Sequence, residues 1–235
     1  PGRQALKAVS KKIVAPSVSK VTLVPGMFGE AKELTENEIQ DIIKDFTTSA
    51  QYSKEFGFTG VQIHAAHGYL ISQFLSPLTN KRKDKWGGSI ENRSRFLIEI
   101  IKKTRSIVGA DFPIGVKINS ADFQRGGFTE DDCIEVLKAL DESGVDLIEL
   151  SGGTYEAPTM VSGNTKESTV KREAFFMEFA EKAKDVIKTP LMLTGGFRSI
   201  KGMDEAIGSE KVDIIGIARP MVWDTHFPKK LLNSL

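Results

Sequence analysis

Hydrophobic residues alternate between two periods along most of the chain. Apolar side chains spaced three and four residues apart predict amphipathic helices, which begin with a capping box at Thr35 and Glu38 and recur after each strand. These helices are expected over 35–57, around 96–107, from 129 to near 144, around 175–187 and over about 199–206. Short β-type runs between them predict strands over 61–64, 114–118, 147–150, 191–194 and 214–218.

Strands that alternate with helices predict βαβ units and a parallel sheet. One face of these strands is apolar, while the other turns polar toward the carboxyl ends, as at Gln62, Lys117 and Glu149. This pattern favours a barrel whose inward side chains lead to an active site at the C-terminal rim. A TIM barrel needs about eight strands, so either the first three are missing or the sheet is open.

Two segments lack a clear period. In residues 1–30 we expect extended loop, β-like stretches at 13–14 and 21–24, and at most a small hairpin. Residues 67–90 are expected to form a long polar loop. No composition shift divides the chain, so residues 1–235 are expected to be one domain. Because the first residue is Pro1 rather than Met, we also expect a fragment or a processed chain.

Composition narrows the classes of function. Lys plus Arg is 32 and Asp plus Glu is 31, and the resulting net charge of +1 argues against a nucleic-acid binder. No run approaches the ~20 apolar residues that span a bilayer, and no signal peptide opens the chain, so we expect no membrane partner. The single cysteine, Cys133, excludes an internal disulfide framework and fits a reducing compartment such as the cytoplasm.

Two of the three histidines fall where the first predicted strand ends, in the segment His64-Ala65-Ala66-His67-Gly68-Tyr69. Catalytic side chains occupy this position in barrels. His64 and His67 could be structural histidines or metal ligands, although no carboxylate-rich motif accompanies them and we expect no metal. A third interpretation has the imidazoles bind a carbonyl oxygen while Tyr69 donates a proton.

Lys117 lies at an inward position near a strand end. A lysine there is costly unless it meets an anion or a developing negative charge. The alternatives are that it reaches solvent or pairs with Glu149.

The last two strand ends predict a phosphate cradle. Gly195 and Gly196 precede a short helix, and Ala218 and Arg219 precede the final helical turns. Backbone N–H groups and helix N-termini at this place in a barrel favour a phosphate-bearing ligand.

The basic segment 80–86 is interpreted first as a solvated loop and second as a contact for the phosphates of a nucleotide or thioester carrier. Cys133 is interpreted as a core or surface thiol rather than a nucleophile.

These segments resemble the Old Yellow Enzyme family of FMN-dependent NAD(P)H oxidoreductases, also called the NADH:flavin oxidoreductase family. The most specific part is the stretch from Gly60 to Pro77, which continues with Asn80-Lys81-Arg82, Trp86-Gly87-Gly88-Ser89 and Glu91-Asn92-Arg93-Ser94-Arg95-Phe96. The resemblance implies a TIM (β/α)8 barrel with FMN at its C-terminal mouth. Only about the last five βα units are present, because Pro1-Gly2-Arg3-Gln4 matches the segment that follows the family's third strand.

The resemblance also implies residue roles. His64 and His67 match the pair that binds the substrate carbonyl oxygen, where the family has His or Asn at the second position. Tyr69 matches the proton donor to the α-carbon. Lys117 stands where the family usually has Arg beside the flavin.

The phosphate cradle matches Gly195, Gly196, Ala218 and Arg219, although the family commonly has Gly-Arg at the last pair. FMN and NADH or NADPH are the implied cofactors.

The function that follows is reduction of the activated C=C bond of an α,β-unsaturated carbonyl compound, with hydride transfer from flavin N5 and protonation by Tyr69. The alternative is a non-catalytic remnant that does not bind FMN alone. A different phosphate-binding barrel, such as an aldolase with Lys117 as a Schiff-base lysine, leaves the histidine segment unexplained. Homo-oligomerisation stays open.

Overall fold

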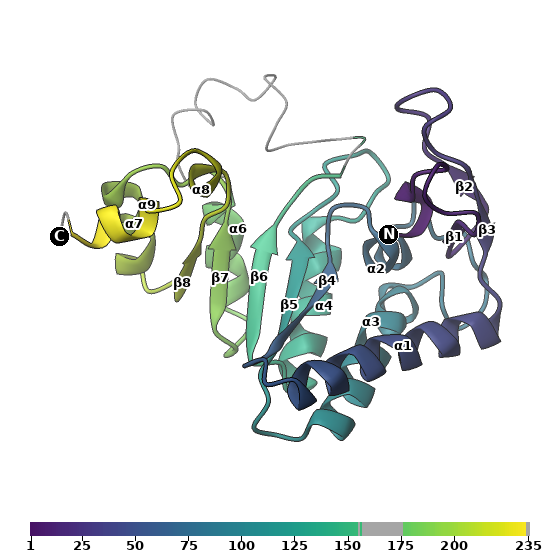
Figure 1. Ribbon diagram of the computed structural model, residues 1–235, viewed down its shortest axis with the longest axis horizontal. Coiled ribbons are helices and arrows are strands. Elements are labelled where there is room, and N and C mark those ends of the chain that lie inside the picture. Colours follow the sequence, from purple (N-terminus) through teal and green to yellow (C-terminus); the bar gives the residue numbers. More distant parts are fainter. Residues whose placement is uncertain (155, 157–175, 234–235) are drawn as a thin grey trace.

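A five-stranded parallel sheet in the order β4-β5-β6-β7-β8 is the main element of the computed structural model, which describes residues 1–154, 156 and 176–233. Figure 1 shows the strands side by side, with α4 and α6 behind them. The strands are β4 (Val61–Ala65), β5 (Ile114–Asn119), β6 (Leu147–Ser151), β7 (Leu191–Thr194) and β8 (Ile214–Gly216). The predicted strands are confirmed, and each begins at the residue that the sequence indicated.

The helices follow the apolar spacing closely. They are α1 (Glu36–Glu55), α3 (Ile90–Val108), α4 (Glu130–Glu142), α6 (Met177–Lys184) and α7 (Ile200–Gly208), followed by the closing turns α8 (Arg219–Trp223) and α9 (Phe227–Leu232). Capping boxes at Thr35 and Thr129 start α1 and α4, because each side chain accepts the third backbone N–H of its helix. The expected fourth helix is shorter than 175–187: Phe175 lies outside the described residues, and α6 ends at Lys184.

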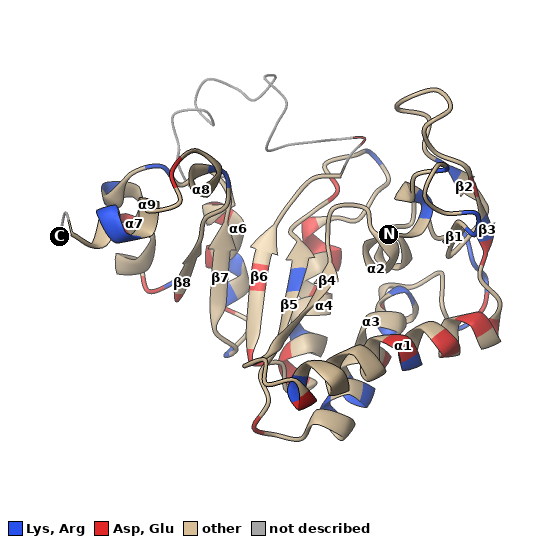
Figure 2. Ribbon diagram, in the orientation of Figure 1, with Lys and Arg blue, Asp and Glu red and all other residues tan. Residues whose placement is uncertain are grey.

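The two faces of the sheet differ in chemistry. Ile114, Val116 and Ile118 of β5 are fully buried in the core that the sheet forms with the helices. We call the opposite face, which carries Lys117 and Glu149, the inner face. On it Lys117 lies directly between His64 of β4 and Glu149 of β6 in the strand register. Figure 2 shows this polarity as neighbouring blue and red segments on β5 and β6.

The N-terminal residues form a second, three-stranded sheet in the order β1-β3-β2. After the 3-10 turn η1 (Gly2–Gln4), its strands are β1 (Val14–Ala15), β2 (Ser19–Lys20) and β3 (Glu30–Glu33). The strand expected at 21–24 is wrong. The polar segment Glu30–Glu33 pairs instead, parallel to β1 and antiparallel to β2, because its backbone and not its side chains provides the pairing.

The sequence predicted that residues 67–90 form a loop throughout, but the structure has a short helix within them. It contains α2 (Leu70–Leu75), whose side chains from Ile71 onward are buried. Phe74 packs on Phe96 of α3, with ring centroids 4.3 Å apart. The helix is only six residues long, too short for a 3.6-residue period to show in the sequence.

Candidate active site

Most of the predicted site residues line one cavity. It has a volume of about 480 Å³ and lies at the carboxyl ends of the strands. Its lining includes the predicted His67, Lys117, Gly195, Gly196, Ala218 and Arg219. A second cavity of about 300 Å³ is lined by the other two, His64 and Tyr69. Residues from four strand ends, 22 to 152 positions apart in the sequence, therefore meet at one rim.

The aromatic residues at the end of β4 and in the turn after it form one cluster. The ring of His64 lies edge-on to the rings of both His67 and Tyr69, with centroid distances of 5.4 Å and 5.1 Å. His64 is therefore the link between the two cavities. Because it projects from β4, its position is fixed by the strand, whereas His67 and Tyr69 depend on the turn that follows.

A backbone hydrogen bond to His64 indicates which nitrogen of its ring carries the proton. Its Nδ1 accepts the backbone N–H of Ala66 at 3.2 Å. Desolvation, together with the charge of Lys117, lowers the pKa of His64, so the ring is neutral at pH 7. A neutral imidazole that accepts at Nδ1 carries its proton on Nε2. His64 thus offers an N–H donor to an acceptor in the cavity.

His67 is held by two buried residues that the sequence analysis did not single out. Its backbone N–H donates to Asn119 Oδ1 at 3.1 Å, and its Nε2 lies 2.9 Å from Ser151 Oγ. Asn119 and Ser151 end β5 and β6 and are almost completely buried. Burial, with the charge of Lys117, lowers the pKa of His67 to about 4. Polar residues at the ends of apolar strands were the sequence signal that could have identified both.

The backbone at the end of β7 has an uncommon conformation. Gly195 and Gly196 have φ of 137° and 88°, values that residues with a Cβ avoid. The chain then enters α7, whose N-cap Ser199 accepts the N–H of Gly202 at 3.2 Å. These glycines line the cavity that also contains Arg198 and Arg219, so an anion placed there meets positive charge and backbone rather than bulky side chains.

Lys117 is paired with Glu149. Its Nζ lies 2.6 Å from Glu149 Oε1, and only 18% of the lysine side chain and 6% of the glutamate side chain are exposed. Burial raises the pKa of Glu149, but hydrogen bonds from Lys117 and Thr194 outweigh it and lower the pKa overall. The ion pair considered as an alternative for Lys117 is therefore present, and Lys117 also lines the large cavity.

The residues that line the large cavity fit FMN, the cofactor that the resemblance implies. FMN combines a phosphate with a flat aromatic ring. The cavity offers an ammonium group from Lys117, arginines and glycines at one end, and apolar surface that includes Trp223. Its volume of about 480 Å³ lies within the roughly 300–1,000 Å³ typical of cofactor sites. Among the described residues there is no cluster of His, Cys, Asp and Glu that could hold a metal ion.

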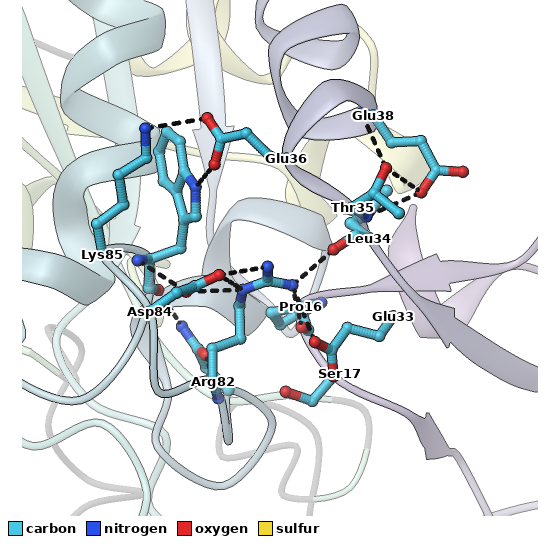
Figure 3. A network of polar contacts seen from close by, with 12 residues as sticks. Pro16, Ser17, Glu33, Leu34, Thr35, Glu36, Glu38, Arg82, Asp84 and Lys85 are labelled. Atoms are coloured by element: carbon cyan, nitrogen blue, oxygen red, sulfur yellow. Dashed lines mark hydrogen bonds and ion pairs between the residues drawn. The ribbon is translucent and has the colours of Figure 1, made fainter.

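The basic segment 80–86 is a loop with exposed lysines, as the sequence favoured, but Arg82 and Trp86 anchor it to the rest of the chain. Arg82 donates to the carbonyl oxygens of Pro16 and Leu34 at 3.0 Å and 2.7 Å and pairs with Asp84 at 2.6 Å (Figure 3). Trp86 is fully buried. We call Asn80, Arg82, Asp84 and Trp86 the latch. Arg82 joins this segment to the chain at the ends of β1 and β3, and Asp84 pairs with it. Asn80 accepts the backbone N–H of Arg82, and Trp86 Nε1 donates to Glu36 of α1. The three lysines of the segment and Asp84 are exposed.

Cys133 is a core thiol, as expected. It is fully buried, and its Sγ donates to the carbonyl oxygen of Asn119 at 3.3 Å. Burial raises the pKa of Cys133 well above its usual value, so the thiolate that a nucleophile requires is disfavoured.

Comparison with known proteins identifies the family of the chain. The sequence model of the NADH:flavin oxidoreductase / NADH oxidase family matches residues 8–235. The NADH-dependent flavin oxidoreductase iliE of Neonectria sp. (strain DH2) is 37% identical over 256 residues, which cover 100% of this chain and 33% of that protein. The chain therefore spans about a third of the length of that relative.

Solved structures of similar fold agree with this match. A complex of 2-naphthoyl-CoA reductase with 2-naphthoyl-CoA superimposes with a TM-score of 0.86 at 33% identity, covering 95% of this chain and 33% of that one. An Old Yellow Enzyme homologue from Zymomonas mobilis gives a TM-score of 0.81 at 26% identity, covering 99% of this chain and 64% of that one. The five-stranded sheet is thus part of an α/β barrel of this type. Within the described residues, none of the helices has the length and apolar character needed to cross a bilayer.

Proposed function

Since the chain belongs to the NADH:flavin oxidoreductase / NADH oxidase family, we propose that its site binds FMN and uses NADH or NADPH to reduce an activated C=C bond. The substrate class is an α,β-unsaturated carbonyl compound. The observation that carries the proposal is the meeting of the histidine cluster with the glycine and arginine cradle in adjoining cavities.

Several residues of the large cavity would hold the cofactor. The cradle at Gly195, Gly196, Ala218 and Arg219 suits the phosphate, because positive charge and accessible backbone converge there. Lys117 faces the same cavity and offers positive charge to the ring system. When bound, FMN supplies the hydride chemistry that no protein side chain provides.

The residues at the end of β4 and in the turn after it would act on the substrate. His64 Nε2–H donates a hydrogen bond to the carbonyl oxygen, and His67 assists from the neighbouring turn. These bonds draw electrons toward the oxygen, so the alkene becomes electron-poor at its β-carbon. Tyr69, whose ring centroid lies 5.1 Å from that of His64, supplies a proton to the α-carbon from its hydroxyl group.

We further propose that residues 1–235 act as one FMN-binding barrel domain without the first three strands of the barrel. Its partner is then a small molecule rather than a nucleic acid or a membrane. A reducing compartment such as the cytoplasm suits the buried thiol of Cys133.

Flavin retention tests the proposal. The purified chain is incubated with FMN and desalted, and its visible absorption spectrum is recorded. We expect about one flavin per folded chain, and a clear loss of flavin in Lys117→Met. The control is Lys138→Met, which removes an exposed lysine of α4 remote from the cavity. A folded wild-type chain that retains no flavin would reject FMN binding by this chain and favour the non-catalytic remnant.

A further inference from the structure

Besides its ion pair with Lys117, Glu149 accepts hydrogen bonds from residues of two other strands. Its Oε2 accepts from Gln62 Nε2 of β4 at 2.9 Å, and its Oε1 accepts from Thr194 Oγ1 of β7 at 2.6 Å. With Lys117 of β5 at 2.6 Å, this carboxylate of β6 joins four adjacent strands on the inner face. A buried carboxylate with three donors is fixed in both position and charge.

The last strand contributes to this arrangement through a close approach. Gly216 of β8 lies opposite Thr194 in the strand register. A Cβ atom at position 216 would lie 1.8 Å from Thr194 Oγ1, so any side chain there would displace the hydroxyl that holds Glu149. The glycine therefore keeps the layer of polar side chains intact across β8.

We propose that Glu149 is the positioning residue that holds the Lys117 ammonium group at the cavity, with Gln62 and Thr194 fixing the carboxylate in turn. Lysine has a flexible four-carbon stem and lacks the rigid fork of arginine. Without a fixed acceptor its Nζ would be free to leave the cavity for solvent. The Glu149 carboxylate, 2.6 Å from Lys117 Nζ and held by hydrogen bonds from Gln62 and Thr194, restricts the ammonium group. This inference deepens the proposed function, since it concerns how the same site presents its charge to FMN.

The first test needs no cofactor. In the chain labelled with ¹⁵N-lysine, the Lys117 ammonium protons exchange slowly with water while they are hydrogen-bonded, so we expect a resolved ammonium signal near neutral pH. Glu149→Gln should abolish it. The matched control, Glu135→Gln, breaks the exposed Lys138–Glu135 pair at 2.7 Å and should leave it unchanged. A wild-type chain without the signal, or a signal that survives Glu149→Gln, overturns the proposal.

The second test asks whether Glu149 acts through Lys117. We expect Glu149→Gln to weaken FMN binding about tenfold in the wild-type background and to have no further effect in Lys117→Met. Equal losses in both backgrounds would indicate a merely structural role, and unchanged or tighter FMN binding would contradict positioning. If the wild-type chain binds no FMN, the proposed function fails, while the ammonium signal still decides the role of Glu149.

A milder variant covers the case in which Glu149→Gln does not fold. Gln62→Met removes one of the donors to the carboxylate and leaves no buried charge unpaired. Gln62 lies outside the lining of the large cavity, so it does not touch the ligand there. We expect a broadened, faster-exchanging Lys117 signal and about a threefold weaker affinity for FMN. An unaltered signal would count against the proposal.

Discussion

Arg82 of the latch and Lys117 of the site are both buried cations, but their surroundings differ. The Arg82 side chain is 6% exposed, and its guanidinium is enclosed by backbone carbonyl oxygens and by Asp84. The Lys117 side chain is 18% exposed, pairs with one carboxylate and borders a cavity of about 480 Å³. The arginine joins two parts of the chain, whereas the lysine keeps one side toward a ligand site.

This difference separates stability from function within one molecule. A planar guanidinium can satisfy several fixed acceptors at once, which suits a permanent junction. A compact ammonium group on a long stem suits a site where an anionic partner arrives and leaves. Variants of the latch should therefore change the free energy of unfolding, and variants of the site should change rates or pH dependence.

The largest expected effect is that of Arg82→Met. It leaves the buried carbonyl oxygens of Pro16 and Leu34 without their donor, which costs about 3 kcal/mol in the free energy of unfolding. Urea denaturation followed by circular dichroism measures this. The control Lys83→Met changes an exposed residue of the same segment and should stay within about 0.5 kcal/mol. A loss for Arg82→Met no larger than that of the control would contradict the latch.

Tyr69→Phe should leave stability unchanged and slow the reduction of an enone about 100-fold, because the proton donor is lost. The rate of flavin reduction by NADH or NADPH should hardly change. Stopped-flow absorbance separates the two half-reactions. Equal slowing of both would rule out the specific role of Tyr69 in protonation.

The smallest expected effect is a change in the free energy of unfolding with pH, caused by His67. The pKa of His67 is lowered to about 4, so the unfolded state binds more protons than the folded state between pH 6.5 and 4. Stability should therefore fall by roughly 2 kcal/mol as the pH drops through this window, less than the full value because the ring is partly exposed. His67→Gln should reduce the slope, as measured by urea midpoints at pH 7.5 and 5.

The latch should respond in a lower pH range. The hydrogen bond from Arg82 lowers the pKa of Asp84 below its usual value. A lowered carboxyl pKa contributes stability above about pH 4 that is lost as the carboxylate is protonated. If His67→Gln left the slope between pH 7.5 and 5 unaltered, His67 would not be the source of the pH dependence there.

The sheet could be predicted from the sequence, whereas the buried polar segments could not. Apolar runs such as that of β5 show a two-residue period and are bounded by turns, so the predicted strand limits were correct within two residues, with the largest difference at the end of β8. The strand Glu30–Glu33 has no such period, because it is held by backbone pairing with β1 and β2. Arg82 was interpreted as solvated because its acceptors, Pro16 and Leu34, are 66 and 48 positions away.

The site was predictable to the extent that its residues lie near the carboxyl ends of strands or directly after them. His64, Lys117 and Gly195 were found in this way, and the structure brings them to adjoining cavities. Asn119 and Ser151 were missed because polar residues at strand ends are common and only their contacts with His67 distinguish them. The roles of all these residues in catalysis remain predictions.

The backbone of His67 limits which amino acids this position accepts. Its φ is 61°, a left-handed conformation in which Asn, Asp and His are several-fold enriched among residues other than glycine. The family resemblance allows His or Asn here, and both types meet this conformational requirement as well as any chemical one. In a saturation library, a replacement at position 67 must thus meet two requirements, one of backbone conformation and one of substrate binding. β-branched residues fail the first, because they destabilise the left-handed backbone whether or not substrate is present.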